Sequence, residues 1–224
     1  MKTDFDRIMQ EIIAGLDPQD PPRLLLHSCC APCSSSVLEQ LAGPFRVTVL
    51  YYDPNIYPRE EYEFRKAEQQ EFIRTYPFAR PVDFLDCEYE PAQFYEAVKG
   101  LEAEPERGSR CTVCYRLRLA RTAAEAARGG YDFFATTLTL SPLKDAARLN
   151  RIGQEEADRL AGEAAGTESV LPAGSAGRKT PRWLPSDFKK RNGYLRSLEI
   201  TKACGMYRQS YCGCEFSLRP ESGK

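Results

Sequence analysis

The sequence reads Leu24-Leu25-Leu26-His27-Ser28-Cys29-Cys30-Ala31-Pro32-Cys33, an apolar run followed at once by three thiols. A buried strand that carries the leucines would deliver the thiols to a turn at its carboxyl end, where open α/β sheets place their ligand sites. Core packing alone is a poor explanation for adjacent cysteines, because neighbouring side chains point apart in regular structure. The stretch therefore predicts a parallel sheet with a metal site at its edge.

Nine cysteines occur in the 224 residues, and four of the others form two short pairs, Cys111-x-x-Cys114 and Cys212-x-Cys214. No apolar run approaches the roughly 20 residues of a membrane-spanning helix, and the acidic N-terminus does not resemble a signal peptide. We therefore expect a cytoplasmic protein, in which closely spaced thiols bind metal or carry redox chemistry. Cys87 and Cys204 stand alone and are expected to be ordinary thiols.

The spacing of the thiols bears on the metal. Thiolates bind both zinc and iron–sulfur clusters, and vicinal cysteines at a turn fit a multi-iron cluster better than a closed tetrahedral zinc site. Buried core thiols are the structural alternative for Cys111 and Cys114. Cys212 and Cys214 are spaced closely enough either to bind one metal or to form a redox-active disulfide.

Strand and helix patterns alternate along the chain, which predicts a single α/β domain over 1–224, with a parallel sheet and helices on both faces. Serines 34–36 are expected to cap the first helix of this series. Residues 1–22 are expected to form a helical extension, 166–186 a Gly- and Pro-rich loop insertion, and the C-terminus a cysteine-bearing segment. The strands are predicted at 23–27, 45–52, 81–85 and 131–137, and the helices at 34–41, 60–75, 91–99, 111–128, 144–165 and 192–203.

The formal net charge is −1, so nucleic-acid binding would need a local patch. Residues 178–196 hold seven basic side chains against one acid, Asp187, with aromatic residues interleaved. Such a run suits phosphates and unpaired bases. The alternative is an ordinary solvated face.

Six motifs together resemble the QueH family of epoxyqueuosine reductases over roughly residues 23–218. They are H-S-C-C-A-P-C, Y-D-P-N-I-Y-P-x-x-E-Y-x-x-R, E-P-E-R-G-S-R-C-x-x-C-Y-x-x-R-L, T-T-L-T-L-S-P-x-K, S-D-F-K-K-R-N-G-Y-x-R-S and Y-R-Q-S-Y-C-G-C-x-F-S. The resemblance implies reduction of epoxyqueuosine to queuosine at the wobble position of tRNA with a GUN anticodon, the last step of queuosine synthesis. It also implies a fold similar to the adenine-nucleotide α-hydrolases, a [4Fe-4S] cluster without cobalamin, and an electron donor that the sequence does not identify.

The same resemblance assigns roles to individual residues. Cys212 and Cys214 match a pair that is either a redox-active disulfide or a set of ligands for an additional iron. Cys33 stands where some relatives carry aspartate, which suits a ligand of that iron, and Asp187 is a further candidate. The cluster ligands match Cys29, Cys30, Cys111 and Cys114. The expected substrate-binding residues are His27, Asp53, Asn55, Tyr115, Lys144, Lys189, Lys190 and Arg191.

Several alternatives remain open at this point. His27 either donates a proton or a hydrogen bond at the cluster, or is a satisfied histidine at the end of a strand. An ATP-dependent tRNA-modifying enzyme of the same fold would need a Ser-Gly-Gly-x-Asp-Ser type of loop where Cys29–Cys33 stand. A zinc-dependent RNA-binding module would contain zinc without sulfide.

Overall fold

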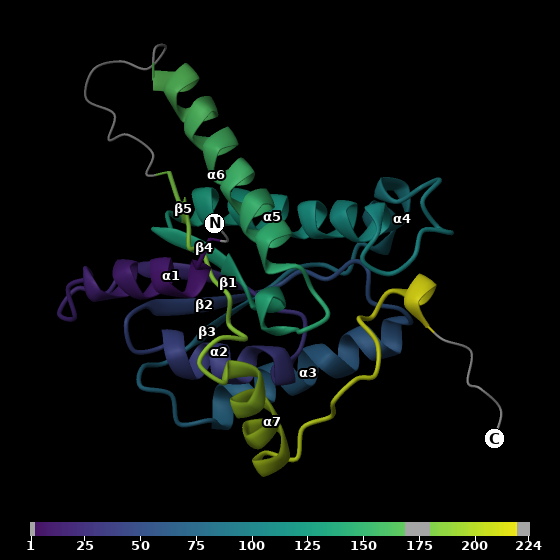
Figure 1. The fold of residues 1–224 in the computed structure, drawn as a ribbon, viewed down its shortest axis with the longest axis horizontal. Helices are drawn as coiled ribbons and strands as arrows, with labels where there is room; N and C mark the ends of the chain where they lie inside the picture. Colours follow the sequence, from purple (N-terminus) through teal and green to yellow (C-terminus); the bar gives the residue numbers. More distant parts are fainter. Residues whose placement is uncertain (1–2, 169–179, 219–224) are drawn as a thin grey trace.

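The computed structural model describes residues 3–168 and 180–218, with a five-stranded parallel sheet at the centre (Figure 1). The strand order is β3-β2-β1-β4-β5, so the chain builds outward on one side of β1 and then crosses to the other. Ligand sites of open parallel sheets lie at such a switch point, beyond the carboxyl ends of the strands. The predicted α/β class is therefore confirmed. The strands are β1 Arg23–His27, β2 Arg46–Tyr51, β3 Asp83–Asp86, β4 Phe133–Thr136 and β5 Arg182–Trp183.

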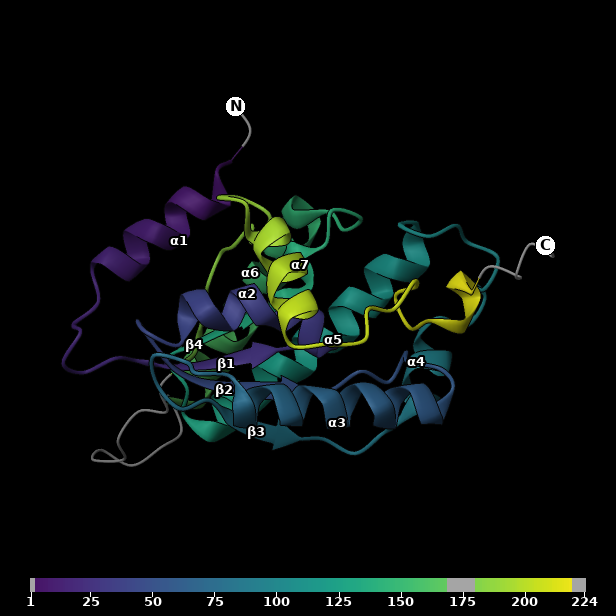
Figure 2. The same ribbon diagram turned by 90° about the horizontal axis from the view of Figure 1, so that it is seen from below.

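Strand β1 is buried on both faces of the sheet. Leu24 and Leu26 pack into one hydrophobic cluster, whereas Leu25 packs into a second. Because successive side chains of a strand point to opposite faces, this requires a helical layer on each side (Figures 1 and 2). The first layer contains α1 Phe5–Ala14, α2 Ala31–Leu41, α3 Arg59–Thr75 and α7 Gly193–Ala203. The second contains α5 Ser109–Gly129 and α6 Ala146–Glu168, and the short elements are α4 Pro91–Ala97, η1 Thr137–Leu140 and η2 Glu215–Ser217.

Helix α2 begins earlier than predicted. The sequence suggested that serines 34–36 cap the helix, but they lie inside it, and the Ser35 hydroxyl donates to the carbonyl three residues back. The helix starts at Ala31, and Pro32 fits its first turn because the missing N–H there has no helical acceptor. Cys30 occupies the N-cap position without a side-chain capping bond, so its thiol is free for other contacts.

Regular elements occupy both ends of the predicted loop insertion over 166–186. Helix α6 continues to Glu168, and β5 pairs in parallel with β4. A strand of two residues leaves no periodic pattern in the sequence, and it forms because Trp183 packs edge-on against Phe134 with 5.2 Å between ring centroids. Residues 169–179 of the predicted insertion, and residues 1–2 of the predicted N-terminal extension, lie outside the described residues.

The chain returns to the sheet edge after α7. Residues 206–214, which we call the C-terminal strap, run along α3 toward α4 in both views (Figures 1 and 2). The strap is followed by η2, where Phe216 packs near the rings of Phe94 and Tyr95 from α4. Among the helices described, none is long and apolar enough to cross a membrane.

Asn150 of α6 fastens β5 to the second helical layer, which generates a prediction about stability. Its buried side chain accepts from Trp183 Nε1 (3.1 Å) and Ser186 N (2.9 Å), and donates to Ser186 O (2.8 Å). Asn150→Ala leaves these buried groups unpaired, so we expect the free energy of unfolding to fall by about 3 kcal/mol. Urea unfolding of the reduced, metal-free protein measures the loss. Gln154→Ala, on the exposed face of the same helix, is the control, and equal midpoints for the two variants would contradict this role.

Candidate metal and redox centre

The turn between β1 and α2 brings three sulfur atoms together. The Sγ atoms of Cys29, Cys30 and Cys33 all lie within 4.8 Å of one another, and Cys29 and Cys30 are 3.9 Å apart. Cys29 and Cys30 are buried, and Cys33 is half-buried in the first turn of α2. The sequence predicted this group at the carboxyl end of the first strand, and the structure places it there. Three thiols so close to each other could hold a metal ion.

The pair on α5 lies beside this turn. Cys111 and Cys114 occupy one face of the helix because residues three apart are neighbours on a helix surface. Cys111 packs against the hydrophobic cluster that contains Cys29 and Cys30, and its Sγ accepts a hydrogen bond from the Arg107 N–H (3.2 Å). Cys114 is buried in the third cluster of the core, together with residues of α4 and the C-terminal segment.

The third group arrives on the C-terminal strap. Cys214 is buried in the cluster that contains Cys114, and Cys212 packs against it. Gly213 between them has φ +101°, and a Cβ there would lie 2.8 Å from Cγ1 of Ile56, so only glycine fits this close approach. The Gly213 carbonyl accepts from Tyr57 N (2.8 Å), which fixes the strap to the loop after β2.

The thiols of the site differ in acidity. Its hydrogen bond with Cys30, together with burial, raises the pKa of Cys29, and burial raises the pKa of Cys114 to about 11. Cys212 behaves in the opposite way, since a hydrogen bond from Cys214 and the charge of Lys144 hold its pKa well below the usual range of a thiol. All nine cysteines are free thiols, and metal binding to the protonated ones would release protons.

Beneath the cysteine turn lies a buried ionic network. Asp53 Oδ1 accepts from Arg118 Nη1 (3.0 Å) and is 3.4 Å from His27 Nε2. Burial alone would raise the pKa of Asp53, but the nearby His27 and Arg118 outweigh it and lower the pKa. His27 also has Thr136 Oγ1 within 2.9 Å of Nδ1. This geometry favours the interpretation of His27 as a satisfied histidine at a strand end, and it makes Asp53 a structural carboxylate.

Lys144 and Tyr115 interact electrostatically with several of the thiols. Burial would lower the pKa of Lys144, but Cys212, Tyr115 and Cys29 around it raise the pKa instead, so the ammonium stays charged. Asn55 is buried in the loop after β2, and its Oδ1 has no hydrogen-bond partner among the described residues. Asn55 therefore keeps a hydrogen-bond acceptor available in the loop after β2.

The predicted basic run is largely engaged in internal contacts. Lys189 Nζ donates to Thr139 O (2.9 Å) and lies 2.7 Å from Asp187 Oδ1, while Arg191 pairs with Asp6 of α1 (3.3 Å). Lys190 is exposed and makes no ion pair within the described part of the chain. Asp187 thus contacts a lysine and is not a member of the three-thiol group. Arg178 and Lys179 lie outside the described residues.

Three residues that the sequence analysis did not single out complete the site. Gln69 of α3 is fully buried, and its Oε1 accepts from Ser28 Oγ (2.8 Å) and Ser34 Oγ (2.9 Å). It therefore joins the two ends of the cysteine turn. The others are Arg65 of α3 and Gln209 of the strap. Both stand in the quoted motifs, which was the available signal, but their spacing says nothing of their contacts.

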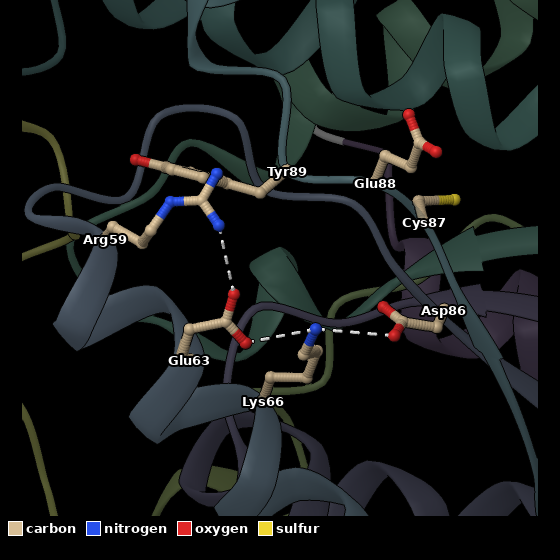
Figure 3. Close-up of a pocket in the computed structure, with 7 residues that line it drawn as sticks. All are labelled: Arg59, Glu63, Lys66, Asp86, Cys87, Glu88 and Tyr89. Carbon is tan, nitrogen blue, oxygen red and sulfur yellow. Dashed lines mark hydrogen bonds and ion pairs between the residues drawn. The ribbon is translucent and has the colours of Figure 1, made fainter.

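A cavity of about 460 Å³ opens near the carboxyl end of β3, beside the first turns of α3 (Figure 3). Its charges compensate one another, because Lys66 Nζ lies 3.1 Å from Glu63 and 3.3 Å from Asp86. Cys87 points its sulfur away from these ion pairs, and burial raises its pKa to about 11 (Figure 3). The cavity therefore offers no uncompensated cation to a phosphate. Its lining residues are Arg59, Glu63, Lys66, Asp86, Cys87, Glu88 and Tyr89.

Comparison with known proteins decides the family. A family model described as "Epoxyqueuosine reductase QueH" matches residues 24–220, which include all three groups of clustered cysteines. The chain belongs to the QueH family. Among its relatives, the epoxyqueuosine reductase QueH of Streptococcus pyogenes serotype M1 is 37% identical, over 97% of this chain and 79% of the relative. That of Staphylococcus epidermidis is 36% identical (96% and 85%), and that of Haemophilus influenzae 35% (90% and 74%).

Membership confirms the family that the six motifs predicted. The relatives are named as reductases, so the predicted class of enzyme, an oxidoreductase, is confirmed as well. The free thiols carried by the turn after β1, by α5 and by the C-terminal strap agree with that class.

The role of Gln69 can be tested by Gln69→Leu. The variant removes the acceptor of two buried hydroxyl groups, so the reduced, metal-free protein should lose about 2 kcal/mol of stability in urea unfolding. Gln70→Leu changes the neighbouring, exposed position of α3 and should unfold close to wild type. If both variants keep the wild-type midpoint, Gln69 does not hold the turn.

Proposed function

We propose that the protein reduces epoxyqueuosine at the wobble position of tRNA with a GUN anticodon to queuosine, the last step of queuosine synthesis. The observation that carries the proposal is the QueH match across residues 24–220, combined with the thiols that converge beyond β1. The epoxide oxygen leaves as water, and the two carbons that held it become a double bond. This consumes two electrons, from a donor still to be identified, and two protons.

The residues present fit a metal centre bound by thiolates. The sulfur atoms of the three-thiol group lie close together, and all the cysteines are free thiols. Buried hydrogen-bond donors nearby lack acceptors within the described residues. We assign a [4Fe-4S] cluster to Cys29, Cys30, Cys111 and Cys114, without cobalamin. When bound, such a cluster supplies single electrons, and an iron with an open position acts as a Lewis acid on oxygen.

The remaining thiols form a second functional group. We propose two alternative roles for them. Either an additional iron is bound by Cys33, Cys212 and Cys214, or Cys212 and Cys214 act as a redox-active dithiol. The Sγ of Cys33 lies within 4.8 Å of those of Cys29 and Cys30, which supports a ligand of a second iron next to the cluster. The low pKa of Cys212 supports either role, because the thiolate is both the metal ligand and the nucleophile.

Neighbouring residues would bind the substrate. The Lys144 ammonium interacts electrostatically with Cys212 and Cys29, so it would hold a proton near the place where we propose that the epoxide oxygen leaves. Tyr115 and Asn55 would line the same pocket, with His27 and Asp53 supporting it from beneath.

Contact with tRNA is proposed for the run Lys189, Lys190 and Arg191. Lys190 is the member whose charge is available to a phosphate, because the other two have internal partners. The cytoplasm is the compartment we propose, since its reducing conditions keep such thiols reduced.

Anaerobically purified protein tests this function directly. With a chemical reductant and tRNA that carries epoxyqueuosine, we expect queuosine, detected in the nucleoside digest by mass spectrometry. Roughly five irons to four sulfides would indicate a cluster plus one iron, and roughly equal amounts a cluster with a dithiol. Cys29→Ala should lose the cluster absorbance, whereas Cys87→Ala should keep it. Zinc without sulfide, or no conversion of the tRNA, would contradict the proposal.

Cys212→Ser separates the second group from the cluster. We expect the variant to keep most of the cluster absorbance and to lose turnover, because the serine hydroxyl replaces neither a thiolate ligand nor a redox thiol. Cys204→Ser, at the exposed thiol that follows α7, is the matched control and should retain activity. Full activity of Cys212→Ser would exclude both roles proposed for the pair.

A further inference from the structure

Arg65 is a buried cation with donors that have no acceptor. Its side chain is 1% exposed, and its Nε donates to Glu61 Oε1 at 2.7 Å. Nη1 and Nη2 are also buried, and neither has a hydrogen-bond partner among the described residues. A guanidinium carries five N–H groups, so four of them lack an acceptor here. Unpaired charged donors are costly in an interior, which indicates that this site is completed by another group.

The surroundings of Arg65 show where that group would lie. The guanidinium carbon is 5.2 Å from the ring centroid of Tyr211, and a Cβ on Gly213 would come within 3.3 Å of Nη1. Gln69 lies one turn further along the same face of α3 and contacts Ser28 and Ser34, which flank the cysteine turn. The free ends of Arg65 therefore stand between the strap and the cysteine turn.

Gln209 approaches the same sulfur from the strap. Its Nε2 lies 2.7 Å from Cys30 Sγ, and its Oε1 is buried without a partner in the described structure. Alternate residues of the strap make the inward contacts, since Gln209 meets Cys30 and Tyr211 meets Arg65, as expected for an extended chain. Gln209 thus donates to Cys30 from the strap, while the unpaired donors of Arg65 come from α3.

We propose that Arg65 and Gln209 donate hydrogen bonds to the sulfur atoms of the metal centre bound at Cys30 and thereby raise its reduction potential. The inference rests on the cluster of the proposed function. Uptake of one electron adds one negative charge to the centre, with no bond or proton changed at Arg65 or Gln209. A nearby cation and N–H donors stabilise that added charge, whereas the carboxylate of Glu61 opposes it.

A redox titration of the anaerobic holoprotein without tRNA, followed by electron paramagnetic resonance, tests the inference. Arg65→Gln and Gln209→Leu should each shift the midpoint to more negative potential. For Arg65→Gln we expect at least a tenfold change in the reduction equilibrium, which is 59 mV for one electron. Glu61→Gln should shift the midpoint in the positive direction. Arg74→Gln and Gln154→Leu replace the same residue types at exposed positions and should leave it unchanged.

The outcomes are distinct. Wild-type midpoints in Arg65→Gln and Gln209→Leu would overturn the inference while leaving the reductase activity standing. If Arg65→Gln does not retain the cluster, the midpoint potentials of Gln209→Leu and Glu61→Gln test the inference. A negative shift for Gln209→Leu together with a positive shift for Glu61→Gln supports the inference, and any other pair of results overturns the inference. A wild-type protein without an iron–sulfur signal would overturn the proposed cluster itself, and the inference with it.

Discussion

The hydrogen bonds of Gln69 hold the turn on which the site depends. One buried amide oxygen receives the hydroxyls of Ser28 and Ser34, which stand on either side of the three-thiol group. A buried hydroxyl without an acceptor is unfavourable, so the turn has few alternative arrangements. Because α3 supplies Gln69, the geometry of the thiols depends on how this helix packs against α2.

Charge is distributed around the turn in a way that suits an anionic centre. Asp53 forms a buried pair with Arg118, and the buried Arg65 pairs with the half-buried Glu61. Each guanidinium keeps at least one nitrogen without a partner in the described structure. Lys144 adds a further cation beside Cys212. Buried charges tend to be compensated, and thiolates that bind metal would supply the missing negative charge. The cations around the thiols would therefore stabilise a thiolate-bound metal centre.

The C-terminal strap brings two further thiols toward the same region of the protein. It carries Cys212 and Cys214 past α3 to Cys114 of α5, and it is fixed on the way by its contacts with Cys30 and Tyr57. The basic run before α7 has another role besides any contact with tRNA, since Arg191 pairs with Asp6 and so helps to hold α1. Positive side chains close together in sequence are therefore not equally available to a phosphate.

The sequence by itself determined the α/β class, the strand that delivers Cys29 to the turn, and the family, because periodic burial and thiol spacing are local properties of the chain. It failed where tertiary contacts overrode a local preference: Ser34 looked like a cap but serves Gln69, and Trp183 forms a strand only by packing on Phe134. Tertiary structure alone decided that Gln209 meets Cys30 and that Tyr211 of the same strap packs on Arg65, since 179 and 146 positions separate these pairs and no pattern encodes such distances. Contacts between residues so far apart in the sequence arise from the packing of α3 and the strap, which cannot be read from local sequence patterns.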